Sequence, residues 1–405
     1  MKPIRLACFA LLLSAACQGP PTTPPGNDTR AVEVILAADG LAKADAALAA
    51  RQRTPETSFQ LGGIRFLRAI ETMLQVRYDS YDGTVPFIPG MAAPLPPNPD
   101  ATFKPDFVET ALKGALDHLD GARTALDAAA AGEFATELPL DAIWLDIDRN
   151  GQRADWESLR ALLEGLGARA DWESFDGKIR FDTADAEWLL AYVHLISGTS
   201  ELVLSVDPTS AINTVYGARQ KMEALGAVGA HDPIFGMEDT IDQIVAVLVA
   251  LDGKPDAVRT RRALDHFRGM IAHNRTFWRE LMAETDNDHE WLPNPQQTSP
   301  FGVEITPEIA AGWQAVLAEL EEMLEGRALI PFWRTPPGDP AASTGVGINL
   351  RKLLSDPGNM NVALLIQGAA VAPYMERGKL VTLNAWNRFG MLTRGDGLLL
   401  AAILN

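Results

Sequence analysis

The sequence predicts an all-α, mostly helical protein with a bundle-like body and at most a small β-hairpin near an acidic loop. Helical periodicity dominates the chain after residue 30, cap signals precede several periodic segments, and alternating strand patterns are scarce. A hydrophobic content of 47% over 405 residues is ample for a buried core.

The first residues predict an export signal. Two basic residues precede an apolar run over residues 6–13, followed by small residues. Residues 14–17, Ser-Ala-Ala-Cys, are similar to the bacterial lipobox, in which the signal is cut before the cysteine and lipid is attached to its thiol. The leucine that usually stands two places before the last alanine is here one place earlier, at Leu13. A plain signal peptide that is cut nearby is the alternative.

The lipobox resemblance implies that residues 1–16 are removed and that Cys17 carries the lipid. Residues 17–30, rich in Pro, Thr, Gly and Asn, then form a flexible tether to the membrane. Gln18 implies, by the usage of lipoproteins, an outer-membrane lipoprotein that faces the periplasm or the cell surface. The only other cysteine, Cys8, lies in the leader, so no thiol is left for a disulfide or a nucleophile.

The charge of the chain argues against nucleic acid as a partner. Acidic residues outnumber basic ones by 53 to 35, which gives a net charge of −18 and repels phosphate backbones. After the leader, no apolar run approaches the roughly 20 residues that a membrane span requires.

Cap signals and periodicity predict the individual helices. Asp106 and Glu109 form a capping-box start for a helix over about 106–119, and Thr306-Pro307 starts another that Gly326 ends. Less sharply bounded patterns predict further helices at about 31–52, 56–78, 183–204, 235–251 and 256–283.

The remaining segments predict one hairpin and two covering loops. Residues 142–145 and 178–181 have short strand patterns that bracket the acidic loop and could pair. The irregular stretches 83–105, with seven prolines, and 287–305 are expected to cover the body, a functional loop being the other possibility.

The predicted organisation is a helical domain over 31–335 and a C-terminal helical lobe over 345–405. The lobe has six basic and three acidic residues, the reverse of the rest of the chain, so we expect it to pack on the acidic body. This lobe resembles uncharacterised exported bacterial proteins, and that resemblance implies no activity.

Residues 146–157, DIDRNGQRADWE, resemble the calcium loop of an EF-hand. Such a loop places oxygen ligands at positions one, three, five, seven, nine and twelve, with glycine at six for the turn. Asp146, Asp148 and Asn150 fill the first three positions, the carbonyl of Gln152 the fourth, and Glu157 the last, where both carboxylate oxygens could bind. We therefore expect calcium as the cofactor.

Two departures suggest that this loop has no partner hand. Arg153 replaces the usual branched apolar residue at position eight, and residues 138–145 look extended rather than helical. Arg149 and Arg153 also offset part of the acidic charge of the loop. The alternative is an N-capped turn in which Asp and Asn side chains accept hydrogen bonds from free backbone amides.

The other acidic, histidine and tryptophan clusters can be explained by a structural role as well as by a functional one. The acids at 284–290 could hold an ion, although a solvated helix end fits them better. His266 and His273 are seven residues apart, about 10.5 Å along a helix, which is too far for one ion without another element between them. His194 is expected at the edge of the core. Five tryptophans favour helix packing over a carbohydrate platform: Trp278, Trp291, Trp313, Trp333 and Trp386.

The imelysin family of exported helical proteins offers a comparison, but its His-x-x-Glu pairing is absent at all six histidines. The sequence thus predicts an exported, lipid-anchored helical protein with one EF-hand-like calcium site and a binding or scaffolding role in the cell envelope, toward a partner that it does not identify. The alternative is an envelope hydrolase that uses Asp286, Asp288 and Glu290 with His266, His273 or His289. Acids and histidines converging in a cleft would favour the hydrolase, and an exposed apolar groove would favour the binding protein.

Overall fold

The computed structural model describes residues 28–81, 88, 90–165, 177–226, 238–288, 290–301, 303–335, 343–393 and 404. This part of the chain is mostly helical and contains two small sheets. The predicted signal peptide, most of the tether and Cys17 lie outside it, as does His289.

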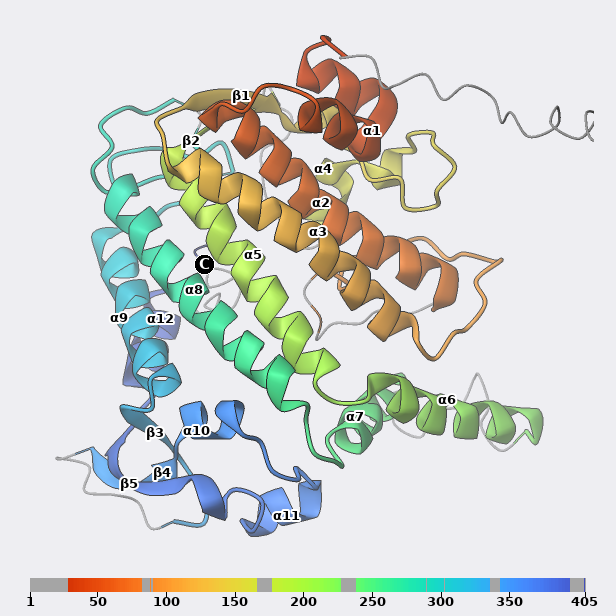
Figure 1. Cartoon of the computed structure of the whole chain (residues 1–405), viewed down its shortest axis with the longest axis vertical. Coiled ribbons are helices and arrows are strands. Elements are labelled where there is room, and N and C mark those ends of the chain that lie inside the picture. Colours follow the sequence, from red (N-terminus) through yellow and green to blue (C-terminus); the bar gives the residue numbers. More distant parts are fainter. Residues whose placement is uncertain are drawn as a thin grey trace, which may run out of the picture.

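Four long helices form the centre of the body (Figure 1). They are α2 (Pro55–Ser80), α3 (Phe107–Ala130), α5 (Thr183–Leu204) and α8 (Ala257–Leu281), and they pack side by side in that order. All four overlap helices that the sequence predicts, because their apolar residues recur at helical spacing. Those of α2 and α3 lie in one buried cluster, those of α8 lie in a second, and α5 contributes to both.

Side-chain caps fix several helix starts. The hydroxyl oxygens of Thr54 and Thr306 accept hydrogen bonds from the third amide of α2 and of α9 (Pro307–Leu324). The carboxylates of Asp182 and Asp256 accept from the second amide of α5 and of α8. Asp106 stands at the start of α3 as predicted, but its side chain makes no cap hydrogen bond.

Outer helices cover the centre on two sides. On one side, α1 (Val32–Ala49) packs against α2. The indole nitrogen of Trp144 donates to the carbonyl of Leu36 at 2.9 Å, and a Cβ at Gly40, where φ is +74°, would lie 3.1 Å from the Trp144 ring. On the other side, α9 packs against α8 and α12 (Asn384–Leu392), around the buried Phe389.

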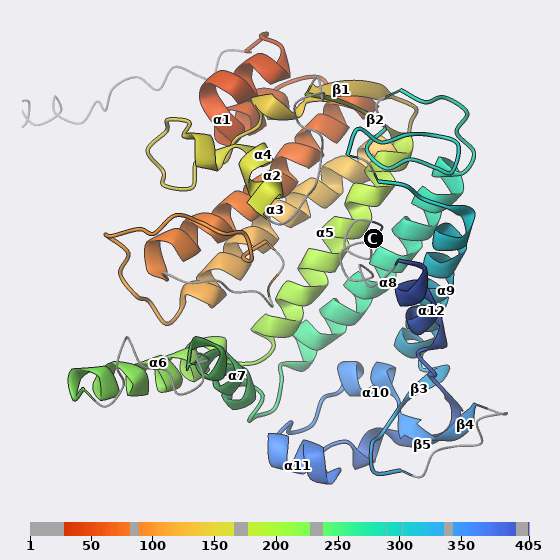
Figure 2. The ribbon, with the colours of Figure 1, turned by 180° about the vertical axis from the view of Figure 1, so that it is seen from behind.

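Two further helices project from one end of the bundle in both views (Figures 1 and 2). They are α6 (Pro208–Ala224), which the sequence did not predict, and α7 (Glu238–Ala250), which it did. Among the described helices, none is by itself long and apolar enough to cross a membrane, whereas α5 and α6 pass that test as a pair bent by 64°.

The predicted hairpin is half right. Strand β2 (Lys178–Asp182) is found, but it pairs antiparallel with β1 (Ala135–Pro139) and not with residues 142–145. A short 3₁₀ helix (Leu140–Ala142) follows β1, and Trp144 instead forms a bridge with Ser158, across the acidic loop itself.

The prediction of a wholly helical C-terminal lobe is wrong. Strands β3 (Ala328–Pro331), β4 (Thr344–Ile348) and β5 (Met375–Leu380) form a second sheet in which each strand pairs with the other two. Because β3 lies within the predicted helical domain, the sheet joins the two predicted parts. Short helices accompany it: α10 (Leu350–Ser355), α11 (Val362–Gln367) and the 3₁₀ turn Ala372–Tyr374.

The lobe does contact the acidic body through opposite charges. Lys379 pairs with Glu322 of α9 at 2.5 Å, and Arg351 pairs with Glu325 at 3.6 Å. The described parts of the two irregular stretches also cover the body, since Met91 and Asn294 are almost fully buried. Of the five tryptophans, Trp278 and Trp313 are buried as expected, but Trp333 is 70% exposed.

Candidate calcium-binding site

The acidic loop 146–157 is closed at its base by backbone hydrogen bonds. The amide of Leu145 donates to the carbonyl of Glu157 at 2.9 Å, and the amide of Leu159 donates to the carbonyl of Ile143 at 3.0 Å. The last three residues of the loop form a 3₁₀ turn (Asp155–Glu157), and helix α4 (Leu159–Gly165) follows it. The two ends of the loop are therefore held together without any ion.

The loop brings three carboxylates together. One oxygen each of Asp146, Asp148 and Glu157 lies within 4.8 Å of the other two, and within the described ranges this is the one such group of three acidic, histidine or cysteine side chains. Calcium binds oxygen at 2.3–2.6 Å, so ligand oxygens on one ion are separated by at most about twice that distance. A single calcium ion can thus contact all three carboxylates.

Hydrogen bonds inside the loop orient its polar side chains. Asp146 accepts from the amide of Gly151 at 3.1 Å, Asp148 from the amide of Asn150 at 3.0 Å, and Asn150 from the amide of Gln152 at 2.6 Å. Gly151 has a φ of +70°, a conformation that glycine adopts without strain. The same bonds describe a capped turn, so they orient the carboxylates but do not distinguish the two interpretations.

Glu157 has the most constrained position in the loop. Its residue is fully buried, and its carboxylate accepts from the amides of Ile147 at 2.7 Å, Asp148 at 3.2 Å and Ala154 at 3.0 Å. A carboxylate has about four lone-pair positions, so about one remains for a metal. In this arrangement Glu157 offers one oxygen to an ion rather than the two that the sequence suggested.

The loop packs on helix α2, where a paired hand would have a second loop. Glu71 accepts from the amide of Asp146 at 2.9 Å, and the Gln75 side chain donates to the carbonyl of Asp146 at 2.7 Å. Arg149 turns toward Asp79 of α2 and pairs with it. The charge of Arg149 is therefore balanced outside the loop.

Negative charge accumulates where the loop meets α2. Burial raises the pKa of Glu71 to about 7, and the neighbouring carboxylates of Asp146 and Glu157 add to that rise. Burial also raises the pKa of Glu157, and the charge of Asp148 acts in the same direction. A bound cation would relieve this repulsion.

The second acidic cluster gathers around one arginine. Arg180 of β2 pairs with Asp182 at 3.2 Å, with Asp286 at 3.0 Å and with Glu290 at 3.8 Å. Residues 285–288, just after the end of α8, are exposed as a solvated helix end would be, but Glu290 is only 3% exposed. Burial raises the pKa of Asp182, Asp185 and Glu290.

Glu284 makes the stability of this cluster dependent on pH. Burial raises its pKa from 4.5 to about 7, and Asp182 and Glu290 reinforce the shift. The folded state therefore holds the proton more tightly, and the stability that this gives below pH 4.5 is lost as the pH rises through about 7. We expect Glu284→Gln, which stays neutral, to gain stability relative to the wild type over this range. Because Glu284 is only half-buried and solvent screens its charge, the gain should be on the order of 1 kcal/mol.

Urea unfolding of both proteins at several pH values measures this difference. Glu308→Gln is the control, because Glu308 is exposed and its pKa is lowered, not raised. A Glu284→Gln difference that stays constant between pH 4.5 and 7 would contradict the expected role of Glu284.

Three histidines meet where α5 packs on α8. His194 lies between the two histidines that the sequence placed too far apart: its Nδ1 is 3.0 Å from that of His266, and its ring stacks on His273 at 5.3 Å. His273 Nδ1 lies 2.6 Å from a carboxylate oxygen of Glu187. Burial lowers the pKa of His194 to about 3, with both other histidines adding to the shift. The sequence could not show this contact, which depends on the pairing of two distant helices.

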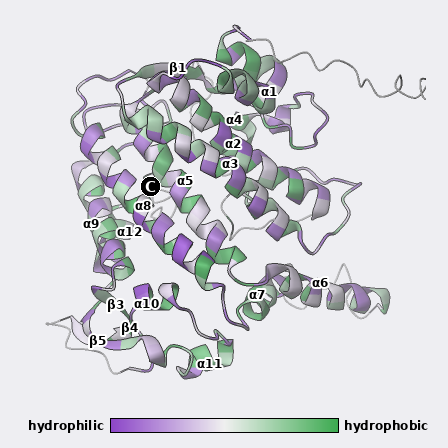
Figure 3. Cartoon of the chain, in the orientation of Figure 1, coloured by the Kyte–Doolittle hydropathy of each residue, from purple (hydrophilic) through white to green (hydrophobic). Residues whose placement is uncertain are grey.

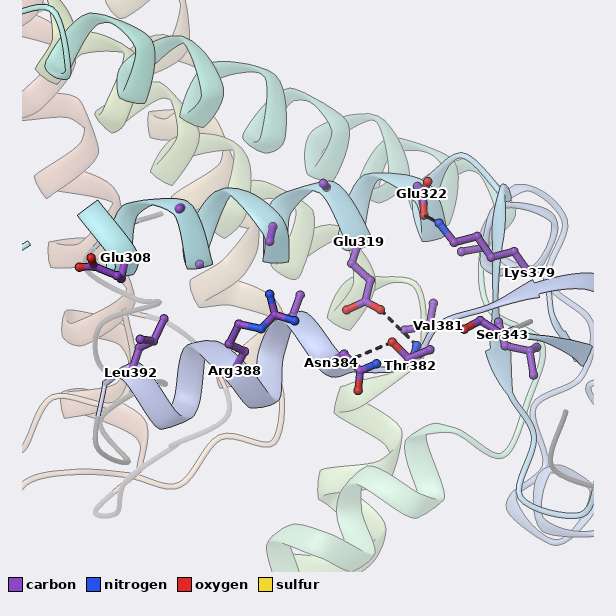
Figure 4. A pocket seen from close by; sticks show the side chains of 17 residues that line it. Glu308, Glu319, Glu322, Ser343, Lys379, Val381, Thr382, Asn384, Arg388 and Leu392 are labelled. Atoms are coloured by element: carbon purple, nitrogen blue, oxygen red, sulfur yellow. Dashed lines mark hydrogen bonds and ion pairs between the residues drawn. The ribbon is translucent and has the colours of Figure 1, made fainter. Parts of the chain in front are cut away.

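A groove of about 730 Å³ lies between α9, α12 and β5 (Figure 4). Small residues of α9 form part of its wall, and two of its acidic residues have partners within the groove. Lys379 pairs with Glu322, and Glu319 accepts from the amide of Thr382 at 3.1 Å. These contacts hold the C-terminal lobe against α9.

Comparisons with known families, curated proteins and solved structures find no match for this chain. The chemistry of its own residues is therefore the basis for a functional proposal.

Proposed function

We propose that this chain is an exported, lipid-anchored protein of the cell envelope that binds one calcium ion in loop 146–157 and has a binding or scaffolding role. The observation that supports it most is the meeting of the Asp146, Asp148 and Glu157 oxygens within 4.8 Å. The remaining ligands would come from Asn150, from the carbonyl of Gln152 and from water at position nine.

In this proposal calcium has a structural role. The ion would join the two halves of a loop whose base links residues 143–145 to 157–159 and whose side rests on α2. Glu157 has a single free position, and within the part of the chain that the structure describes no partner hand contacts the loop. Its affinity should therefore be that of weak extracellular sites. Such sites have dissociation constants on the order of 10⁻⁴ to 10⁻³ M.

Calcium is expected to stabilise the protein by a modest amount. At ~1 mM calcium and a dissociation constant of ~0.1 mM, binding adds about 1.4 kcal/mol to the free energy of unfolding. In a chain of this size that raises the melting temperature by a few degrees at most. A thermal scan in calcium, with magnesium as the control, measures the shift, and magnesium should have less effect because it prefers a stricter octahedral site.

Trp156 should report the same event by fluorescence. Its ring stacks on Tyr78 of α2 with centroids 5.5 Å apart, whereas Trp144 is already 2% exposed and hydrogen-bonded. Trp156→Phe should therefore remove the calcium response, and Trp144 should contribute little. A melting temperature and a fluorescence spectrum that ignore millimolar calcium would reject the site.

The membrane anchor has its own test. Wild-type protein produced in a bacterium that processes lipoproteins is expected to sediment with membranes and to incorporate labelled palmitate. Cys17→Ser should abolish the labelling, because no other cysteine remains after the leader. Unchanged labelling of that variant would exclude Cys17 as the anchor.

The hydrolase alternative requires acids and histidines in one cleft. Asp286 and Glu290 instead contact Arg180, while His273 contacts Glu187 and His266 contacts His194. The described residues do form an apolar groove between α6, α7 and the body, which is the feature expected of a binding protein.

A further inference from the structure

A cavity of about 470 Å³ opens where α6 and α7 meet the end of the helix bundle. Its walls come from α3, α5, α6, α7, α8 and α10, and its size is in the range of small-molecule sites. None of its lining residues carries a charge, in a chain of which 22% is charged. A ligand for this cavity must therefore be uncharged along the part that enters it.

The polar groups of the lining are turned to other partners. The Ser205 hydroxyl donates to the carbonyl of Leu202 at 2.7 Å, and the Thr260 hydroxyl donates to that of Ala257 at 3.4 Å. The hydroxyls of Tyr81 and Tyr216 bond to each other at 2.8 Å. Gln243 is the other polar side chain of the lining, and it is not without a partner. The surface left for a ligand is therefore mostly hydrocarbon, which disfavours sugars and nucleotides because their buried polar groups would lack partners.

Helix α7 is apolar on its outer side as well as on the side that lines the cavity. Ala246, Val247 and Ala250 line the cavity, while Ile244 and Leu248 are 46% and 41% exposed on the outside. Figure 3 shows hydrophobic residues along this helix, which projects with α6 from the body. The first half of α7 contains the acidic residues Glu238, Asp239 and Asp242, whereas residues 244–250 are all apolar. A helical segment that is hydrophobic all round belongs in a core or in lipid, and an exposed apolar patch marks an interaction surface.

We propose that this cavity binds the acyl chain of a lipid, which enters from a membrane surface that the outer face of α7 contacts. The chain supplies the uncharged hydrocarbon that the lining requires, and the polar head stays outside. The ligand would come from the membrane itself, because the apolar outer face of α7 would rest on the lipid next to the opening of the cavity. The inference does not depend on the calcium site.

Binding of cis-parinaric acid, a fluorescent fatty acid, tests the proposal. The full chain is used with Cys17→Ser in every sample, so that no covalently attached lipid can fill the cavity. We expect a saturable rise in fluorescence that palmitate competes away. Ala246→Trp and, independently, Ala250→Phe fill the cavity and should each weaken binding at least tenfold, with unchanged circular dichroism spectra.

Val245→Trp is the matched control, because Val245 is 38% exposed on the same helix and does not line the cavity. It should bind the probe as the parent does. Competition by palmitate alone would assign a free fatty acid, and competition by palmitoyl-lysophosphatidylcholine as well would assign the chain of a phospholipid.

Three results would overturn the proposal. The first is the absence of saturable binding, and the second is an equal loss of binding in all three variants. The third is a dimer, seen by light scattering, that Ala246→Trp converts to a monomer, because a second copy of this chain would then fill the groove.

Discussion

Glu157→Ala is expected to destabilise the protein by about 3 kcal/mol or more in calcium-free buffer, because three backbone amides would lose their acceptor inside the fold. Those amides belong to Ile147, Asp148 and Ala154, and Glu157 is fully buried. Urea unfolding with a calcium chelator, followed by circular dichroism, measures the loss. Glu157 is thus a structural residue of the empty loop as well as a candidate ligand.

Two related variants test this explanation. Glu157→Gln keeps one acceptor oxygen but turns an amide group toward a backbone donor, so its loss should be intermediate. Asp155→Ala removes an exposed carboxylate two residues away and should change stability by less than about 0.5 kcal/mol. A loss below about 1 kcal/mol for Glu157→Ala would show that the loop does not depend on this carboxylate.

Arg77→Ala is expected to lower the free energy of unfolding by about 3–5 kcal/mol, because it removes two hydrogen bonds and leaves a cavity. Arg77 is 2% exposed, and its guanidinium donates to the carbonyls of Met91 and Ala93, at 2.5 Å in the second case. Burial lowers the pKa of Arg77 to about 10. The Arg77 side chain thus binds the proline-rich stretch, residues 83–105, to α2 through hydrogen bonds.

Arg77→Met separates the two contributions, since it keeps most of the volume and loses only the hydrogen bonds. Its loss in urea unfolding should lie between those of the wild type and Arg77→Ala. Arg279→Ala is the control, because the Arg279 side chain is 71% exposed and pairs only loosely with Glu280, at 3.5 Å. An Arg77→Ala variant as stable as this control would mean that the stretch is held by its apolar contacts alone.

The helices were predictable where periodicity and caps agree. Thr306-Pro307 and Gly326 predicted the two ends of α9. The capping hydroxyl of Thr306, the fixed φ of Pro307 and the left-handed conformation of Gly326 depend only on neighbouring residues, so the sequence is enough to show them. Helix α6 also begins with a cap signal, Asp207-Pro208. It was not predicted, because its apolar and polar residues do not separate into two clear faces. Strands β4 and β5 were missed because glycines and charges interrupt their alternation, and their pairing depends on distant segments.

The candidate site was predictable to the same extent. The spacing of Asp146, Asp148 and Glu157 predicted a loop in which their oxygens meet, since a short loop with glycine at the turn is determined by local geometry. The sequence did not predict three contacts of the loop: the three amides that donate to Glu157, the hydrogen bond to Glu71, and the pairing of Arg149 with Asp79. Each depends on how α2 packs against the loop.

Calorimetric titration of calcium into three proteins tests the calcium site most directly. The wild type should bind one ion with a dissociation constant on the order of 10⁻⁴ to 10⁻³ M. Asp148→Asn keeps the shape and the acceptor for Asn150 but removes one charge from the group of three, and it should abolish the signal. Asp155→Asn removes the same charge from the same loop outside that group, and it should bind as the wild type does. No heat of binding in the wild type, or equal loss in both variants, would show that DIDRNGQRADWE is a capped turn without a calcium site.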